Sequence, residues 1–390
     1  MIFNKNSYEA GHFAAKPAAK RANVSPLIMV ICLVLTAAIL FTLFGHVGSI
    51  GSTTGTDVAI MDKFDQFVTN NILAELGGKI EVERSYWLND NDMVAPKPNA
   101  DCYGQADDPA SLQWLLNSAA KLLKGQNTLF TTETVIKEGS TVHYYLDDTI
   151  LAITWKQVVN NCVYTFSEVK IAHASQFRRF LSEGQYGSGV LHTTSEMAAS
   201  VNAVVASAGD YYCYRTGGLV LTNGTIHRSA GNSSLDTCYI NEEGDLLFTR
   251  RGELATREEL DQYVAENNVR FTLSFGPLML LDGENCVPYH YSLGEINDIY
   301  PRAALCQMDK LHYVVVTANM EDPYYNRPTV SGFAKSLQEL GIPTAYTLDG
   351  GQTATIVMNN QVINTVSYGA EREISDIIYF ATAIPSGQAE

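Results

Sequence analysis

The chain has 390 residues, of which 46% are hydrophobic and 17% are charged, a composition typical of a globular protein with one large domain and accessory parts. Its 42 acidic residues outnumber its 26 basic residues, which gives a net charge of −16 at neutral pH. A surface of that sign repels nucleic acid and anionic lipid, so we expect no nucleic-acid partner.

Residues 27–44 form an apolar run that contains no charged side chain. Its length is about what a helix needs to cross a bilayer core of ~30 Å. The first 26 residues carry four basic side chains and one acidic side chain, so the positive-inside rule predicts a cytoplasmic tail (1–26) and an external remainder. A cleaved signal peptide is the alternative, but its apolar region is usually only ~7–15 residues long. We therefore expect a single-pass signal anchor (27–45) in the cell membrane, with the C-terminal domain extracellular.

The segment 46–125 is expected to be a linker and a helical accessory region. Apolar residues recur at intervals of four between Ile60 and Leu76, which predicts an amphipathic helix. A second helix is predicted to begin at Asp108, as its cap, with Pro109 in the first turn, and to end at Gly125. The acidic stretch between the two helices lacks the spacing of a calcium-binding loop, so we interpret it as a surface loop.

Strands are predicted from residue 126 onwards, where the main domain (126–390) begins. Three β-branched and aromatic runs, separated by Asp-Asp and Asn-Asn turns, read as strands: Val142–Tyr145, Ile150–Trp155 and Val163–Ile171. Asn223-Gly224 is a favoured two-residue hairpin turn.

Helices and strands alternate in the remainder of the chain. Thr193 and Thr256 each open a capping box, and a further helix is predicted over Val330–Leu340. Further strands are predicted at 204–206, 271–275, 311–316 and 344–348. Together these elements predict an α+β fold with a mixed β-sheet core and surrounding helices.

Six cysteines follow the predicted anchor: Cys102, Cys162, Cys213, Cys238, Cys286 and Cys306. Three disulfides are possible among them, but fifteen pairings are open and the sequence does not choose. Neither the cysteines nor the eight histidines show the spacing of a zinc site. We expect no metal and no cofactor.

An acidic glycine turn, Asp349-Gly350-Gly351, joins two of the predicted strands. Glycines allow backbone angles and a close approach of ligand that a Cβ would prevent. Asp349 is therefore predicted to lie at the end of a strand and to point outward, where a site could form. The simpler interpretation is a β-turn whose Asp bonds only its own backbone.

Four more sequence pieces accompany this turn in a fixed order. They are Ala208-Gly209-Asp210-Tyr211-Tyr212 with Gly217-Gly218-Leu219-Val220, Ser274-Phe275-Gly276-Pro277, Pro301-Arg302-Ala303-Ala304, and Glu371-Arg372 with Ser375-Asp376-Ile377-Ile378. With the Asp349 turn, they resemble the signature of the phosphodiester glycosidase family over roughly residues 164–383. The resemblance implies an extracytoplasmic hydrolase that acts on sugar-phosphate linkages of envelope or exopolysaccharide glycans.

The resemblance also implies roles for particular residues. Asp349 and Asp210 would be the catalytic carboxylates, because a phosphate monoester leaves readily and the reaction mainly needs a nucleophile or base at the anomeric carbon. Arg302 and Arg372 would bind the phosphate of a carbohydrate or sugar-phosphate substrate. The rest of the substrate-binding set would be Gly209, Gly276, Gly350, Gly351 and Thr355. Each arginine could instead form a structural ion pair.

The chain departs from the family pattern at two places. Ala208-Gly209 stands where the family usually has Asn-Gly, and Thr317-Ala318-Asn319 stands where it usually has Asp-Gly-Arg. These departures leave a second hypothesis open, a non-catalytic relative that kept the fold and binds glycans.

Overall fold

The computed structural model describes residues 88–89, 92–131, 133, 141–291, 296–319 and 325–385. The predicted anchor (27–45) and the predicted helix from Ile60 to Leu76 lie outside these residues. Within the described ranges, no helix is long and apolar enough to span a membrane.

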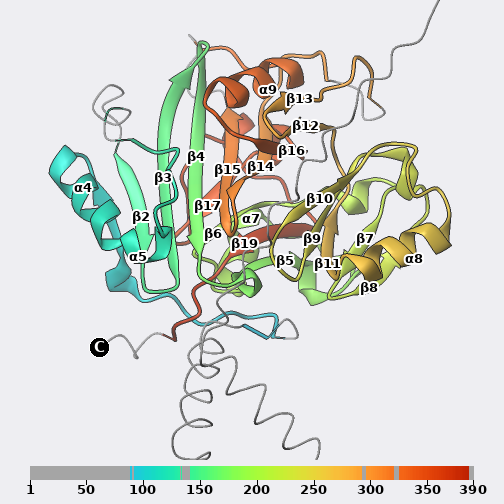
Figure 1. Ribbon diagram of the computed structural model, residues 1–390, viewed down its shortest axis with the longest axis horizontal. Helices are drawn as coiled ribbons and strands as arrows, with labels where there is room; N and C mark the ends of the chain where they lie inside the picture. The colour runs from blue at the N-terminus through green and yellow to red at the C-terminus, as the bar shows by residue number, and fades with distance from the viewer. Residues whose placement is uncertain are drawn as a thin grey trace, which may run out of the picture. The chain divides into compact units, whose positions relative to one another are not determined.

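Three β-sheets and a few helices make up the described chain, so the predicted α+β class is confirmed (Figure 1). Every strand ladder that the structure describes is antiparallel, and one isolated bridge, between Cys162 and Asn326, is parallel. The expected mixed sheet is therefore replaced by antiparallel pairing. Short turns explain much of this pairing, because they join antiparallel neighbours directly, whereas parallel strands need a long crossover.

The largest sheet has nine strands. In spatial order they are β1 (Tyr103–Ala106), β2 (Val142–Leu146), β3 (Ile150–Val159), β4 (Cys162–Ile171), β15 (His312–Asn319), β14 (Arg302–Asp309), β16 (Thr344–Leu348), β12 (Leu278–Leu281) and β13 (Glu284–Asn285). The turn between β3 and β4 places Asn160 and Asn161 at positive φ, a conformation that asparagine tolerates better than most residues. This turn confirms the hairpin that the Asn-Asn pair predicts.

Two five-stranded sheets complete the fold. One runs β10 (Leu246–Thr249), β9 (Thr237–Asn241), β11 (Val269–Leu273), β7 (Val220–Thr222) and β8 (Thr225–Arg228). The other runs β18 (Gln361–Val362), β17 (Ile356–Met358), β6 (Val205–Ala208), β19 (Asp376–Phe380) and β5 (Phe177–Leu181). The hairpin predicted at Asn223-Gly224 is confirmed as the connection between β7 and β8.

Three of the five described helices begin at the capping residues that the sequence predicts: α4 (Pro109–Ser118), α7 (Thr194–Ser200) and α8 (Arg257–Glu266). The other two are α5 (Ala120–Leu123) and α9 (Val330–Glu339). Asp108 accepts the amide protons of Ala110 and Ser111, and both Thr193 and Thr256 form complete capping boxes.

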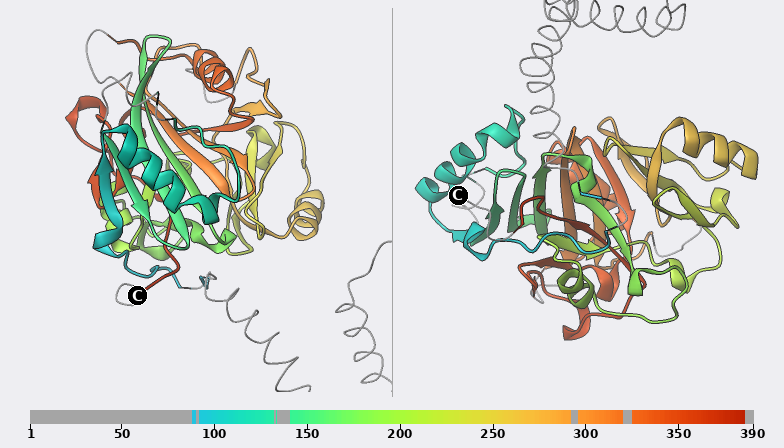
Figure 2. Two further views of the ribbon diagram at one scale, coloured as in Figure 1. Left: turned by 60° about the vertical axis from the view of Figure 1, so that its left-hand side comes forward. Right: turned by 90° about the horizontal axis from the view of Figure 1, so that it is seen from below.

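The two faces of the nine-stranded sheet belong to different cores. One face packs against α4, α5 and α9 around Trp155 and Phe333, and Figure 2 shows α4 lying across the strands at that edge. The opposite face packs against both smaller sheets around Phe177, Tyr313 and Tyr346. The accessory segment after residue 92 is thus part of the same core, because β1 pairs with β2 and α4 buries its leucines there.

Candidate functional site

Asp349 and Asp210 each lie just after the end of a strand, in two different sheets. Asp349 directly follows β16, and the pairing of Ala303 with Leu348 places the start of β14 beside it. Asp210 follows β6, and the pairing of Ala208 with Ile377 places Asp376 beside it. Two strand ends therefore each carry a carboxylate and a neighbouring polar residue.

Asp349 forms an ion pair with Arg372. Its Oδ2 lies 2.6 Å from Nη2 of Arg372, and its Oδ1 accepts the amide of Gly350 at 3.0 Å. The Asp349 side chain is only 12% exposed, and burial raises the pKa of Asp349 to about 6 although the Arg372 charge opposes this rise. A carboxyl group with that pKa is ionised at neutral pH but readily accepts a proton, which suits a general base.

Two tyrosine rings hold Arg372 in place. Tyr211 and Tyr214 stack with ring centroids 4.6 Å apart, and the Arg372 guanidinium carbon lies 4.9 Å and 5.2 Å from the two centroids. Tyr211 has a positive φ of 66°, which is unusual for a residue with a bulky side chain. The strained backbone and the cation-π contacts both fix the position of the partner of Asp349.

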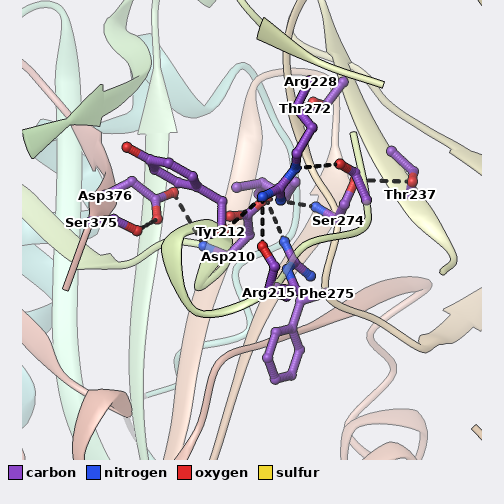
Figure 3. Close-up of polar contacts among 12 residues, drawn as sticks. Asp210, Tyr212, Arg215, Arg228, Thr237, Thr272, Ser274, Phe275, Ser375 and Asp376 are labelled. Atoms are coloured by element: carbon purple, nitrogen blue, oxygen red, sulfur yellow. Dashed lines mark hydrogen bonds and ion pairs between the residues drawn. The ribbon is translucent and has the colours of Figure 1, made fainter. Parts of the chain in front are cut away.

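Asp210 belongs to a buried ionic cluster with Arg179 and Asp376. Nη2 of Arg179 lies 2.9 Å from Oδ1 of Asp210 and 2.8 Å from Oδ2 of Asp376, and all three side chains are buried. Asp210 also accepts the amide of Ser274 at 2.9 Å, as Figure 3 shows. Burial raises the pKa of Asp376, while the Arg179 charge opposes this rise. Because one arginine is shared between two buried carboxylates, the position of Asp210 is tightly fixed.

Arg215 interacts with both carboxylate groups. Its Nη2 is 3.3 Å from Oδ2 of Asp210 (Figure 3), and its charge also lowers the pKa of Asp349, as the last of several smaller effects beside burial. The same residue lines a pocket of about 440 Å³, together with Cys213, Tyr214, Thr216, Gly217, Ser234 and Leu235. The sequence expectations did not include Arg215, Arg179 or Asp376 among the functional side chains.

Arg302 serves a different purpose from the one expected. The β14–β16 register places its backbone beside Asp349, but its guanidinium donates to the carbonyl groups of Asp298 (2.7 Å) and Pro328 (3.4 Å). The side chain also lies over the ring of Tyr300. Through these two bonds Arg302 supports the surrounding loops.

The backbone amides of Gly350 and Gly351 and the hydroxyl of Thr355, which we expected to bind substrate, are bonded within the protein. The amide of Gly350 donates to Asp349, the amide of Gly351 donates to the carbonyl of Pro301 at 3.0 Å, and Thr355 Oγ1 is 3.5 Å from the carbonyl of Gln352. Neither amide is thus directed at a ligand. A Cβ on Gly350 would overlap the carbonyl of Pro301, so the glycine is needed for the close approach of the two chain segments.

Gly209 and Gly276 also allow close packing beside the site. A Cβ on Gly209 would overlap the carboxylate of Asp376, and one on Gly276 would overlap the hydroxyl of Tyr291. Gly276 has a φ of 71° and precedes the cis peptide bond to Pro277. Gly209 therefore lets Asp376 lie against the backbone, and Gly276 does the same for Tyr291.

No cluster of three or more His, Cys, Asp or Glu side chains that could hold a metal ion occurs within the described ranges. The six cysteines after the predicted anchor are all free thiols. The fold is thus held together without the disulfides that the cysteine count allowed.

Residues 196–381 match the sequence model of the phosphodiester glycosidase family. This range contains Asp210, Arg215, Asp349, Arg372 and Asp376, whereas Arg179 lies before it. Over these residues the chain is similar to the phosphodiester glycosidase family, and the resemblance inferred from the sequence is confirmed.

Two solved structures are similar to the chain at low sequence identity. A hypothetical protein from Synechocystis has 13% identity and a TM-score of 0.49, and the match spans 61% of this chain and 63% of that protein. The zebrafish N-acetylglucosamine-1-phosphodiester alpha-N-acetylglucosaminidase catalytic domain, auto-inhibited by its pro-peptide, has 16% identity and a TM-score of 0.49, with 76% of this chain and 96% of that chain covered. No curated protein matches the chain.

Proposed function

We propose that the protein is a hydrolase that cleaves the bond between the anomeric carbon of a sugar and the oxygen of a phosphodiester. The observation that carries this proposal is the buried carboxylate of Asp349, paired with Arg372 at a strand end and raised to a pKa of about 6. Perturbed carboxylates of this kind gather at active sites. The match of residues 196–381 to the phosphodiester glycosidase family supports the same reaction class.

The reaction that we propose for Asp349 needs little help from a general acid. As the bond to the anomeric carbon breaks, its electron pair leaves with the phosphate monoester, whose oxygen is already stabilised without a proton. Water supplies the new bond to the anomeric carbon and gives its proton to Asp349, which acts as the general base. In the covalent variant Asp349 attacks the carbon first, and water releases the sugar in a second step.

Asp210 is assigned a positioning role and not the catalytic one expected from the sequence. It is fully buried and bonded to Arg179, Arg215 and the amide of Ser274. Its oxygen atoms are therefore occupied by protein donors. Through Arg215 its negative charge still sets the field around Asp349, because charges act over several ångströms in a buried setting.

The setting that we propose for this reaction is the cell envelope. The apolar run at 27–44 and the basic residues before it favour an anchored protein whose folded part faces outward. Its substrate would then be a sugar-phosphate linkage of an envelope glycan or an exopolysaccharide. Protease added to intact cells should remove the chain after the anchor, and a protected C-terminal part would contradict this orientation.

The alternative function is glycan binding without turnover. Two departures from the family pattern favour it: Ala208 at the end of β6 and Thr317-Ala318-Asn319 at the end of β15. Asn319 is buried, and its amide donates to the carbonyl of Ala354 at 2.9 Å, so this segment supports the fold near the turn.

A panel of sugar-1-phosphodiesters tests the two functions against each other. The full-length protein is incubated with each compound, and release of the phosphate monoester is measured with a phosphatase-coupled assay. The hydrolase proposal expects release from at least one linkage. Binding to a phosphorylated glycan without release across the panel would establish the alternative.

A further inference from the structure

Arg215 carries a charge that the protein leaves largely unsatisfied. Its side chain is only 9% exposed, yet its Nε, Nη1 and Nη2 atoms are buried and make no hydrogen bond within the described part of the chain. The 3.3 Å ion pair with Asp210 is a long one. Buried guanidinium groups normally satisfy their donors, so an arginine in this state needs an acceptor from elsewhere.

The neighbouring carboxylates are engaged mainly by other donors. Asp210 binds Arg179 and the amide of Ser274, and Asp349 binds Arg372 and the amide of Gly350. Apart from the 3.3 Å contact with Asp210, Arg215 forms no ion pair with a carboxylate within the described ranges.

A pocket of about 440 Å³ opens beside Arg215, and its other lining residues carry no charge: Cys213, Tyr214, Thr216, Gly217, Ser234 and Leu235. Such a volume lies in the usual range for small-molecule sites. Tyr214 offers an exposed ring, and the side chains of Thr216 and Ser234 offer hydroxyl groups. Protein atoms cover the three Arg215 nitrogens. Binding of a ligand to these nitrogens therefore requires the pocket-lining segment 213–217 to shift.

We propose that Arg215 binds the phosphate of a phosphorylated sugar that occupies this pocket. The guanidinium fork fits an oxyanion, and a tetrahedral phosphate offers more acceptor oxygens than a carboxylate to a group with three unpaired nitrogen atoms. The inference rests on the proposed function for the identity of the sugar phosphate as substrate. Arg215 thereby takes the phosphate-binding role that the sequence assigned to Arg302.

Cys213 supplies a direct readout of this binding, because its thiol is exposed and lines the pocket. The full-length protein is treated with iodoacetamide, and alkylation of each cysteine is followed by peptide mass spectrometry. N-acetylglucosamine 1-phosphate at about ten times its Kd should slow the alkylation of Cys213 about tenfold. Cys286, which is partly exposed and lies outside the pocket lining, should keep its rate and serves as the internal reference.

Two ligand controls and two variants complete the experiment. Unphosphorylated N-acetylglucosamine and glucuronic acid should not protect Cys213. Arg215→Met should abolish protection by the sugar phosphate, while Arg257→Met, on the exposed face of α8, should leave it unchanged. The buried thiols of Cys238 and Cys306 report on folding, because they should stay unreactive in every folded variant. If Arg215→Met exposes them, Arg215→Gln replaces it, since glutamine can still donate to Asp210.

Three results would overturn the inference: no protection by the sugar phosphate in the parent protein, equal protection by glucuronic acid, or full protection in a folded Arg215 variant. These results differ from a failure of the proposed function. Protection without any turnover would support the Arg215 site and the glycan-binding alternative together. Turnover without protection would retain the hydrolase and refute the role of Arg215.

Discussion

Replacing Asp349 by Asn should make the protein inactive and, at neutral pH, more stable. The substitution keeps the shape of the side chain and removes its charge. Asp349 has a pKa of about 6 in the folded protein, compared with 3.8 for an ordinary carboxyl group. The folded state therefore holds the proton more tightly than the unfolded state does, and ionisation of Asp349 lowers the free energy of unfolding.

The magnitude of this effect follows from the two pKa values. At about 1.36 kcal/mol for each tenfold difference, the ionised carboxylate destabilises the folded state by about 3 kcal/mol once the pH is above 6. Asn avoids this cost, and the attraction of Arg372 needs no separate subtraction because the pKa of about 6 already includes it. We expect Asp349→Asn to gain about 3 kcal/mol at pH 7.5 and to lose about 2 kcal/mol of that advantage by pH 4.5.

Urea unfolding of the parent and the variant at both pH values measures this difference. The matched control is Asp261→Asn on α8, where the carboxylate is 52% exposed and pairs with Arg257 across one helical turn. This control should change the free energy of unfolding by only a few tenths of a kcal/mol. A variant that is less stable than the parent at pH 7.5, or a difference that does not depend on pH, would refute the reasoning.

Three further predictions concern the same site. If Asp349 is the base, the rate of phosphodiester cleavage should rise with pH through about 6 and then level off, and a rate that falls over this range would exclude the ionised carboxylate as the active form. Arg372→Gln removes the charge that opposes the high pKa of Asp349, so the rising limb of the pH–rate profile should move to higher pH; an unmoved limb would show that the ion pair does not tune the base. Arg179→Met should lower the free energy of unfolding by about 3–5 kcal/mol, because it leaves Asp210 and Asp376 buried without their shared partner, and a loss below 1 kcal/mol in chemical unfolding would contradict the ionic cluster.

Local chemistry explains what the sequence could predict about the fold. The caps at Asp108, Thr193 and Thr256 and the hairpin turn at Asn223 depend on residues within a few positions of one another, and each occurs where expected. The division into three antiparallel sheets depends on pairings between distant strands. No local pattern determines these pairings, so the strand order could not be predicted from the sequence.

The candidate site likewise has features that the sequence could predict and features that it could not. The turn after β16 and the position of Asp349 follow from the strand-glycine pattern, and the structure brings Arg372 into contact with Asp349. The role of Asp376 depends on the register of β6 with β19, which joins it to Asp210 across 166 positions. The sequence alone also cannot give the direction of a long side chain, so it could not separate Arg302, which bonds to loop carbonyl groups, from Arg215, which pairs with Asp210.

We propose above that Asp349 drives the cleavage of a sugar-phosphodiester bond. Phosphorus-31 NMR tests it directly, because a phosphodiester and the phosphate monoester that it releases give separate signals. The full-length parent protein should convert the diester of an accepted substrate into the monoester, and Asp349→Asn should be slower by about 10²-fold or more. Conversion at the same rate by a folded Asp349→Asn protein would contradict the account.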